Sequence, residues 1–198
     1  SYGGTVTVTR AAAEKTTLIC GEVSFSGNIS GSELDINGNV VIPSGVTVAS
    51  GNVIKITGNL KTDGTYKPGA DLEIGGNLSG NGVLSATAGM TSFTGSAVSV
   101  SGSNTFNDLK FGTAGQTVTF DSGTTQTVDG KFVAQGASGN LITLKSDSGT
   151  WTFKFTESNT NNVIEYLSLK NSVFVDKNGG TNPAAALNST DGGNNTNW

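Results

Sequence analysis

The chain has 198 residues, of which 34% are hydrophobic and 13% charged, with 29 glycines, no histidine and a net charge of −4. This length suffices for one domain with a core, and the low charge argues against disorder. Without histidine and with Arg10 as its single arginine, the chain excludes catalytic triads and histidine-based metal centres. The absence of a basic face or a long apolar stretch excludes nucleic-acid binding and membrane insertion.

The N-terminal segment Thr5-Val6-Thr7-Val8-Thr9 alternates strictly, which predicts a strand with both valines on one face. Residues 11–15 are good helix formers, but the run is too short for a stable helix and is expected to be a cap or a linker. We predict that residues 1–15 form a strand and linker that act as an assembly segment. Because the chain begins with Ser1, a processed product or an excised fragment is expected.

Short apolar pairs separated by Gly-Asn or Ser-Gly steps fill the chain from Gly21 to Leu84. Glycine and asparagine tolerate a left-handed backbone, so each step is expected to turn the chain sharply between short strands. Asn28 and Asn52 lie 24 residues apart, and Asn52 and Asn77 lie 25 apart. Such a period is typical of a solenoid of about eight to ten coils, which we place over residues 16–175.

Larger apolar residues continue the pattern in the second half of the chain. After Val175 the apolar rhythm is lost, so residues 176–198 are predicted to be a C-terminal loop and end segment in which Trp198 is an end plug or an interface residue. The predicted core there consists of Phe106, Leu109, Phe111, Val118, Phe120, Val128, Phe132, Leu141, Ile142, Leu144, Trp151, Phe153, Phe155, Ile164, Leu167, Leu169 and Phe174.

Several segments of the C-terminal half share one style of sequence, namely residues 139–146, 151–153, 163–172 and 189–198. Together they resemble a recurring module of bacterial extracellular right-handed parallel β-helix proteins, and residues 106–109 and 123–128 are similar to the preceding coils of that module. The resemblance implies an all-β, right-handed parallel β-helix, a single-domain β-solenoid, of the kind found in surface adhesins and secreted repeat proteins. The N-terminal half shares only the style of the repeat.

Carboxylate pairs are the one catalytic possibility, because β-helix proteins include polysaccharide lyases and hydrolases. Asp71 and Glu73 share a strand face, and Asp121 and Asp129 flank a turn. Solvated surface carboxylates explain both pairs better, since the repeats contain no arginine to hold an anionic sugar. No catalytic residue and no cofactor are therefore predicted.

Calcium is the one metal considered, in the oxygen-rich loops that begin at Asp176 and Asp191, although neither loop has the spacing of a defined calcium site. The single cysteine, Cys20, is interpreted as a packing residue. Outward threonine rows could suit ice or glycan, but β-propensity explains them better, because threonine does not recur at one register in every coil. Four Asn-X-Ser/Thr sequons, at Asn28, Asn77, Asn188 and Asn194, are expected by chance in this composition.

These features favour a non-enzymatic extracellular structural protein that associates with itself, end to end, as a surface or filament subunit. Solenoid ends are open strand edges, and the predicted strand Thr5–Thr9 could be added to a neighbouring molecule. An alternative is an adhesive or stalk module of a larger adhesin that binds glycan or a host surface. A carbohydrate-active β-helix enzyme is the least favoured hypothesis.

Overall fold

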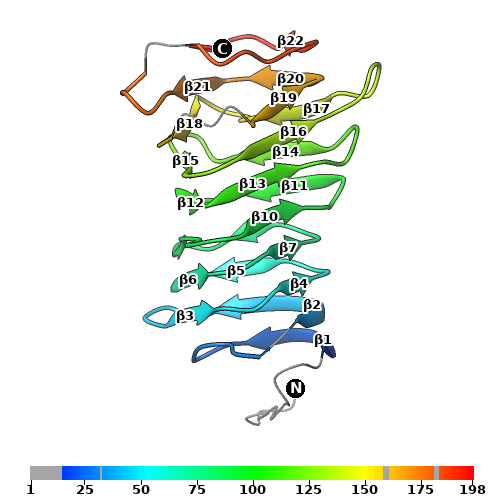
Figure 1. The fold of residues 1–198 in the computed structure, drawn as a ribbon, viewed down its shortest axis with the longest axis vertical. Coiled ribbons are helices and arrows are strands. Elements are labelled where there is room, and N and C mark those ends of the chain that lie inside the picture. The colour runs from blue at the N-terminus through cyan, green and yellow to red at the C-terminus, as the bar shows by residue number, and fades with distance from the viewer. Residues whose placement is uncertain (1–14, 32, 158–160, 181–182) are drawn as a thin grey trace.

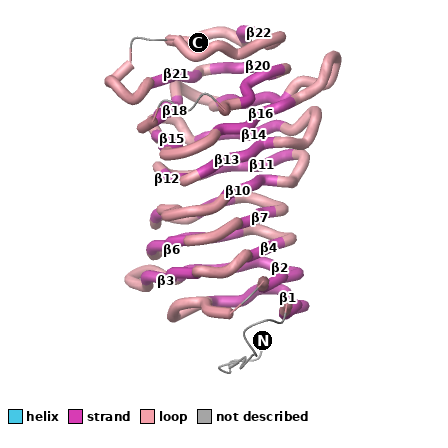
Figure 2. The backbone as a smooth tube through the Cα atoms, in the orientation of Figure 1, coloured by secondary structure: helices cyan, strands magenta, loops and turns pink. Residues whose placement is uncertain are grey.

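The computed structural model describes residues 15–31, 33–157, 161–180 and 183–198. Short strands wind in about eight turns around a common axis, with the first coil at one end of the stack and the last at the other (Figure 1). No described residue is helical, and loops join the strands throughout (Figure 2). The predicted all-β parallel solenoid is therefore confirmed.

Each coil contributes about one strand to each of three faces, and every ladder between the named strands is parallel. β1 (Thr16–Ser24) and β2 (Leu34–Ile42) bend across the first and second faces. The first face continues with β4 (Ile54–Ile56), β7 (Leu72–Ile74), β10 (Met90–Phe93), β13 (Asp108–Phe111), β16 (Phe132–Gln135) and β19 (Val163–Glu165). The second has β5 (Leu60–Thr62), β8 (Leu78–Ser79), β11 (Ala97–Val100), β14 (Thr117–Phe120), β17 (Ile142–Lys145), β20 (Leu167–Lys170) and β22 (Thr190–Asp191). The third has β3 (Thr47–Ser50), β6 (Thr65–Pro68), β9 (Val83–Leu84), β12 (Asn104–Phe106), β15 (Thr125–Val128), β18 (Trp151–Phe155) and β21 (Ser172–Val175).

The core is a set of inward rows that run parallel to the axis. Because side chains alternate along a strand, every second residue joins a row and stacks on its equivalent in the next coil. Towards the C-terminal end the rows become aromatic: the rings of Phe120 and Trp151 stack with centroids 3.9 Å apart. All the predicted core residues of the second half are buried except Leu141. Ile142 and Leu144 take the inward positions of that strand, which leaves Leu141 half exposed.

The Gly-Asn steps work differently from the prediction. The Gly-Asn steps that end at Asn28, Asn39, Asn52, Asn59 and Asn77 contain no left-handed residue, whereas the Ser-Gly steps at Gly31, Gly45 and Gly80 do, as predicted, with φ of 125°, 76° and 108°. Asn39, Asn59 and Asn77 instead form a ladder along the axis, in which each Oδ1 accepts the backbone N–H of the next asparagine at 2.8 Å. The coils repeat here at 20 and 18 residues rather than at 24 and 25.

Asn28 and Asn52, which defined the predicted period, lie outside this ladder. Asn28 accepts the N–H of Ala49, whereas the Asn52 amide is buried without a partner. The apparent period therefore joined positions that are not equivalent in the structure.

The segment predicted as a C-terminal loop adds a further coil to the solenoid. Leu187 pairs with Glu165 on the first face, β22 pairs with β20 on the second, and Thr196 pairs with Val173 on the third. The solenoid thus continues past Val175.

Candidate functional site

The candidate catalytic carboxylates are used to hold neighbouring coils together. Asp71 accepts the backbone N–H of Met90 at 2.9 Å, and Asp121 accepts that of Gly102 at 3.3 Å. Asp129 accepts the hydroxyl of Thr156 at 2.7 Å.

Asp71 and Glu73 do share the outward side of their strand, as predicted, because the buried Leu72 between them points inward. No described polar contact joins either carboxylate to a cation. This arrangement is that of surface residues with a structural role.

The two calcium candidates lie on different coils and cap their own turns. One oxygen of Asp176 accepts the N–H groups of Asn178 and Gly180, at 2.9 and 2.8 Å. One oxygen of Asp191 accepts the N–H of Gly193 at 2.8 Å and the side-chain amide of Asn195. Within the described ranges, no three His, Cys, Asp or Glu side chains are grouped so as to hold a metal ion.

An ion-pair network braces the first coils on the first face. Lys15 contacts Glu33 at 3.0 Å and Asp35 at 2.7 Å, and Lys55 contacts Glu33 at 3.0 Å. Hydrogen bonds from Lys15 and Lys55 lower the pKa of Glu33. Lys15 is the one residue of the predicted linker that the structure describes, and its side chain contacts the solenoid.

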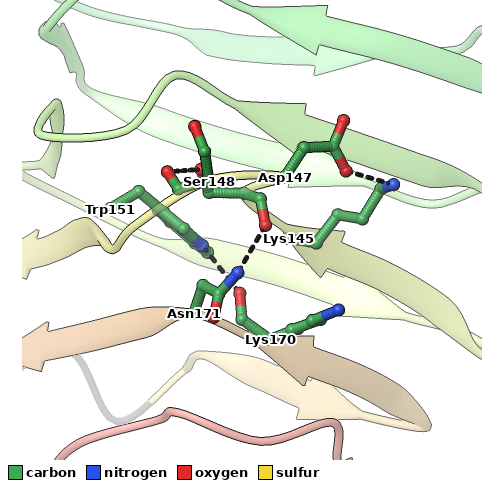
Figure 3. A network of polar contacts seen from close by, with 7 residues as sticks. Lys145, Asp147, Ser148, Trp151, Lys170 and Asn171 are labelled. Carbon is green, nitrogen blue, oxygen red and sulfur yellow. Dashed lines mark hydrogen bonds and ion pairs between the residues drawn. The ribbon is translucent and has the colours of Figure 1, made fainter.

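Polar contacts also brace the corner between β17 and β18, where Trp151 enters the core (Figure 3). The indole N–H of Trp151 donates to the carbonyl of Lys170 at 3.4 Å, and the Asn171 amide donates to the carbonyl of Ser146 at 2.7 Å. Lys145 pairs with Asp147 at 2.6 Å. These contacts satisfy the polar atoms of a corner, and they form no open site.

A shallow groove of about 340 Å³ crosses the second face over the asparagine ladder. Its wall carries an acid and an amine as well as amides and hydroxyls. The lining consists of Glu22, Asn39, Val40, Val41, Asn59, Lys61, Asn77, Ser79 and Ser99.

The two ends of the solenoid differ in chemistry. At the N-terminal end Leu18, Val23, Phe25 and Ile29 pack on the core but are only partly buried, and Cys20 is likewise half buried rather than fully enclosed.

At the C-terminal end polar residues close several inward rows. In the last coil Asp191 occupies the position that Leu169 has in the coil before it, and Asn197 occupies the position that Phe174 has. The ring of Trp198 lies 5.3 Å from that of Phe174 and 6.3 Å from that of Phe153, while its indole N–H has no partner. Trp198 therefore covers the last aromatic row, which is the position expected of an end plug.

The predicted assembly strand Thr5, Val6, Thr7, Val8 and Thr9 lies outside the described residues.

The third face has an outward row of threonine, serine and valine. Threonine is not present in every coil of this row, as predicted. The row includes Thr47, Thr65, Val83, Thr125, Thr152, Val173 and Thr196. No helix of the described chain is long and apolar enough to cross a membrane.

Comparison with known proteins finds no matching family model, no matching curated protein and no matching solved structure. The class that the fold defines is a parallel β-solenoid. The resemblance to bacterial extracellular β-helix proteins stays a prediction.

Proposed function

We propose that this chain is a non-enzymatic structural protein of the cell exterior that associates with copies of itself through the ends of the solenoid. The proposal rests on the positions of the exposed apolar side chains. The large hydrophobic side chains with high exposure in the described chain are Ile19, Leu187 and Val83, and the first two lie on the first and last coils. Burial of such side chains favours association.

The backbone supports the same assignment. Among the described strands, β1 has one neighbour, β2, and β22 has one neighbour, β20. An exposed strand edge pairs readily with another chain. The non-enzymatic part of the proposal rests on the carboxylates, which accept hydrogen bonds between coils, and on the lack of histidine.

Sedimentation velocity and negative-stain electron microscopy test this proposal. Rods should lengthen with protein concentration in steps of about 40 Å, since about eight coils advance ~4.8 Å each. A chain that stays monomeric at every concentration would contradict end-to-end association. Release of reducing ends or unsaturated products from polysaccharides, lost in Asp71→Asn or Asp121→Asn, would contradict the non-enzymatic assignment.

The groove on the second face favours a second candidate function, an adhesive or stalk module that binds glycan. Asparagine amides and serine hydroxyls repeat there along the axis at the coil spacing, beside one amine, Lys61, and one carboxylate, Glu22, which suits an extended polar chain. Calorimetric titration with neutral and acidic oligosaccharides tests it. Lys61→Ala should weaken binding, and Lys110→Ala, on the first face, should not. Equal binding by both variants would exclude the groove as the binding site.

A further inference from the structure

The two most exposed large apolar side chains lie on one outward row of the first face, at opposite ends. Ile19 is 83% exposed and Leu187 is 62% exposed. Ile19 pairs with Asn37, and the row then advances coil by coil to Glu165 and Leu187. If a second copy continued the stack in register, its Ile19 would lie beside Leu187.

Neither segment that carries these residues contains a charge: residues 16–19 begin β1, whereas residues 184–187 are irregular apart from the bridge that Leu187 makes with Glu165. Residues 16–19 read Thr-Thr-Leu-Ile, and residues 184–187 read Ala-Ala-Ala-Leu. Leu18 and Ala186 are half buried at the two ends of one inward row. Lys15 is the charged residue nearest the first segment, and it is engaged by Glu33 and Asp35 of its own chain. Within the described part of the chain, the two segments themselves therefore bring no charged side chain into the contact.

The hydrogen bonds of the last coil determine which of its backbone groups point away from the solenoid. Leu187 donates its N–H to the carbonyl of Ile164 at 2.9 Å and accepts the N–H of Tyr166 at 2.9 Å. Alternate residues of a parallel strand bond to opposite neighbours. The N–H and carbonyl of Ala186 therefore face away from the solenoid.

The same reasoning applies to β1 at the other end. Thr16 donates its N–H to the carbonyl of Glu33 at 3.0 Å, so Thr16 and Leu18 bond towards β2. The backbone groups of Thr17 and Ile19 face the opposite way. Ala186 at one edge and Thr17 and Ile19 at the other thus present complementary donors and acceptors, whereas the N–H of Ala184 is already donated to the carbonyl of Asn197 at 3.0 Å.

We propose that residues 16–19 of one copy pair in parallel with residues 184–187 of the next copy; this inference rests on the end-to-end association proposed above. Ala186 N–H donates to the carbonyl of Thr17, Ile19 N–H donates to the carbonyl of Ala186, and the Ile19 side chain packs against Leu187. On the second face the row of Leu169 ends in the polar Asp191, which adds no apolar contact there.

The test compares Ile19→Lys, Leu187→Lys and Val83→Lys in the full chain by sedimentation velocity, with circular dichroism as a check of folding. Val83 is the matched control, because it is an exposed valine, 41% exposed, on the third face. Each end variant should raise the dissociation constant about tenfold or more, whereas Val83→Lys should assemble like the wild type. A mixture of the two end variants should form heterodimers and no longer rods, since each variant keeps one intact end. The double variant Ile19→Lys/Leu187→Glu should recover assembly in a salt-sensitive way.

Three outcomes overturn the inference. If the wild type forms rods and both end variants still do, the joining strand is elsewhere and end-to-end association stands. If Leu187→Lys dimerises by itself while Ile19→Lys is monomeric, two N-terminal ends meet instead. If deletion of residues 1–10 abolishes rods and Ile19→Lys does not, the predicted strand Thr5–Thr9 is the joining element. Absence of rods in the wild type refutes the proposed function itself.

Discussion

Replacing Gly58 with alanine should destabilise the solenoid, although the backbone conformation there is open to any residue. A Cβ at position 58 would lie 2.4 Å from Asn39 Oδ1 and 2.6 Å from the carbonyl oxygen of Gly38, whereas real Cβ atoms essentially never come closer than 3.0 Å. The Asn39 side chain can leave the ladder, but the backbone oxygen of Gly38 cannot move by itself, so relief of the clash also requires the two coils to separate. Overpacking costs about 1–3 kcal/mol, and the lost hydrogen bond to the Asn59 N–H adds about 1 kcal/mol.

Thermal unfolding followed by circular dichroism measures the effect, with Gly51→Ala as the matched control. Gly51 also precedes an asparagine, but a Cβ there meets no atom within 4 Å. We expect Gly58→Ala to lower the melting temperature by about 4–16 °C and Gly51→Ala to leave it unchanged or raise it by a few degrees. Equal melting temperatures for the two variants would refute the close-approach explanation of the Gly-Asn steps.

Other parts of the solenoid give further measurable expectations. Asn59→Ala removes the acceptor of the Asn77 N–H and should cost about 1–2 kcal/mol in denaturant unfolding; Asn81→Ala, with no described side-chain hydrogen bond, should change stability by less than about 0.5 kcal/mol. Trp151→Ala, which removes a fully buried ring from its stack on Phe120, should cost about 3–5 kcal/mol, and a cost below about 1 kcal/mol would contradict the aromatic core. Burial raises the pKa of Tyr66 to about 12, against the opposing hydrogen bond from Ser50. Because this folded pKa lies above the ordinary value of 10.0, the stabilisation is complete below pH 10 and is lost as the pH rises towards 12, by about 2–3 kcal/mol. Tyr66→Phe should remove that alkaline step from the pH dependence of unfolding, and an unchanged step would assign it to another group.

The sequence predicted the class of fold because alternation and repetition are local properties. A residue's inward or outward position follows from its parity along a strand, so Phe111, Trp151 and Leu169 could be assigned to the core from the pattern alone. The same parity placed Asp71 and Glu73 together on an outward side. The sequence predicted Trp198 to be an end plug or an interface residue, and in the structure its ring lies against those of Phe174 and Phe153.

Register between coils was decided only by the tertiary structure. Glycine and asparagine permit both a sharp turn and a close stack. The Gly-Asn steps at Asn39, Asn59 and Asn77 proved to be a stack, because Gly58 and Asn59 lie on their equivalents rather than at a left-handed corner. Spacing in the sequence likewise joined Asn28 to Asn52, which occupy different positions in their coils. The placement of Ile19 and Leu187 on one row depends on summing the lengths of every intervening coil, including the long one between Val133 and Val163. The total length of these coils cannot be read from a local pattern, because corner loops change length without changing the alternation of the strands they join.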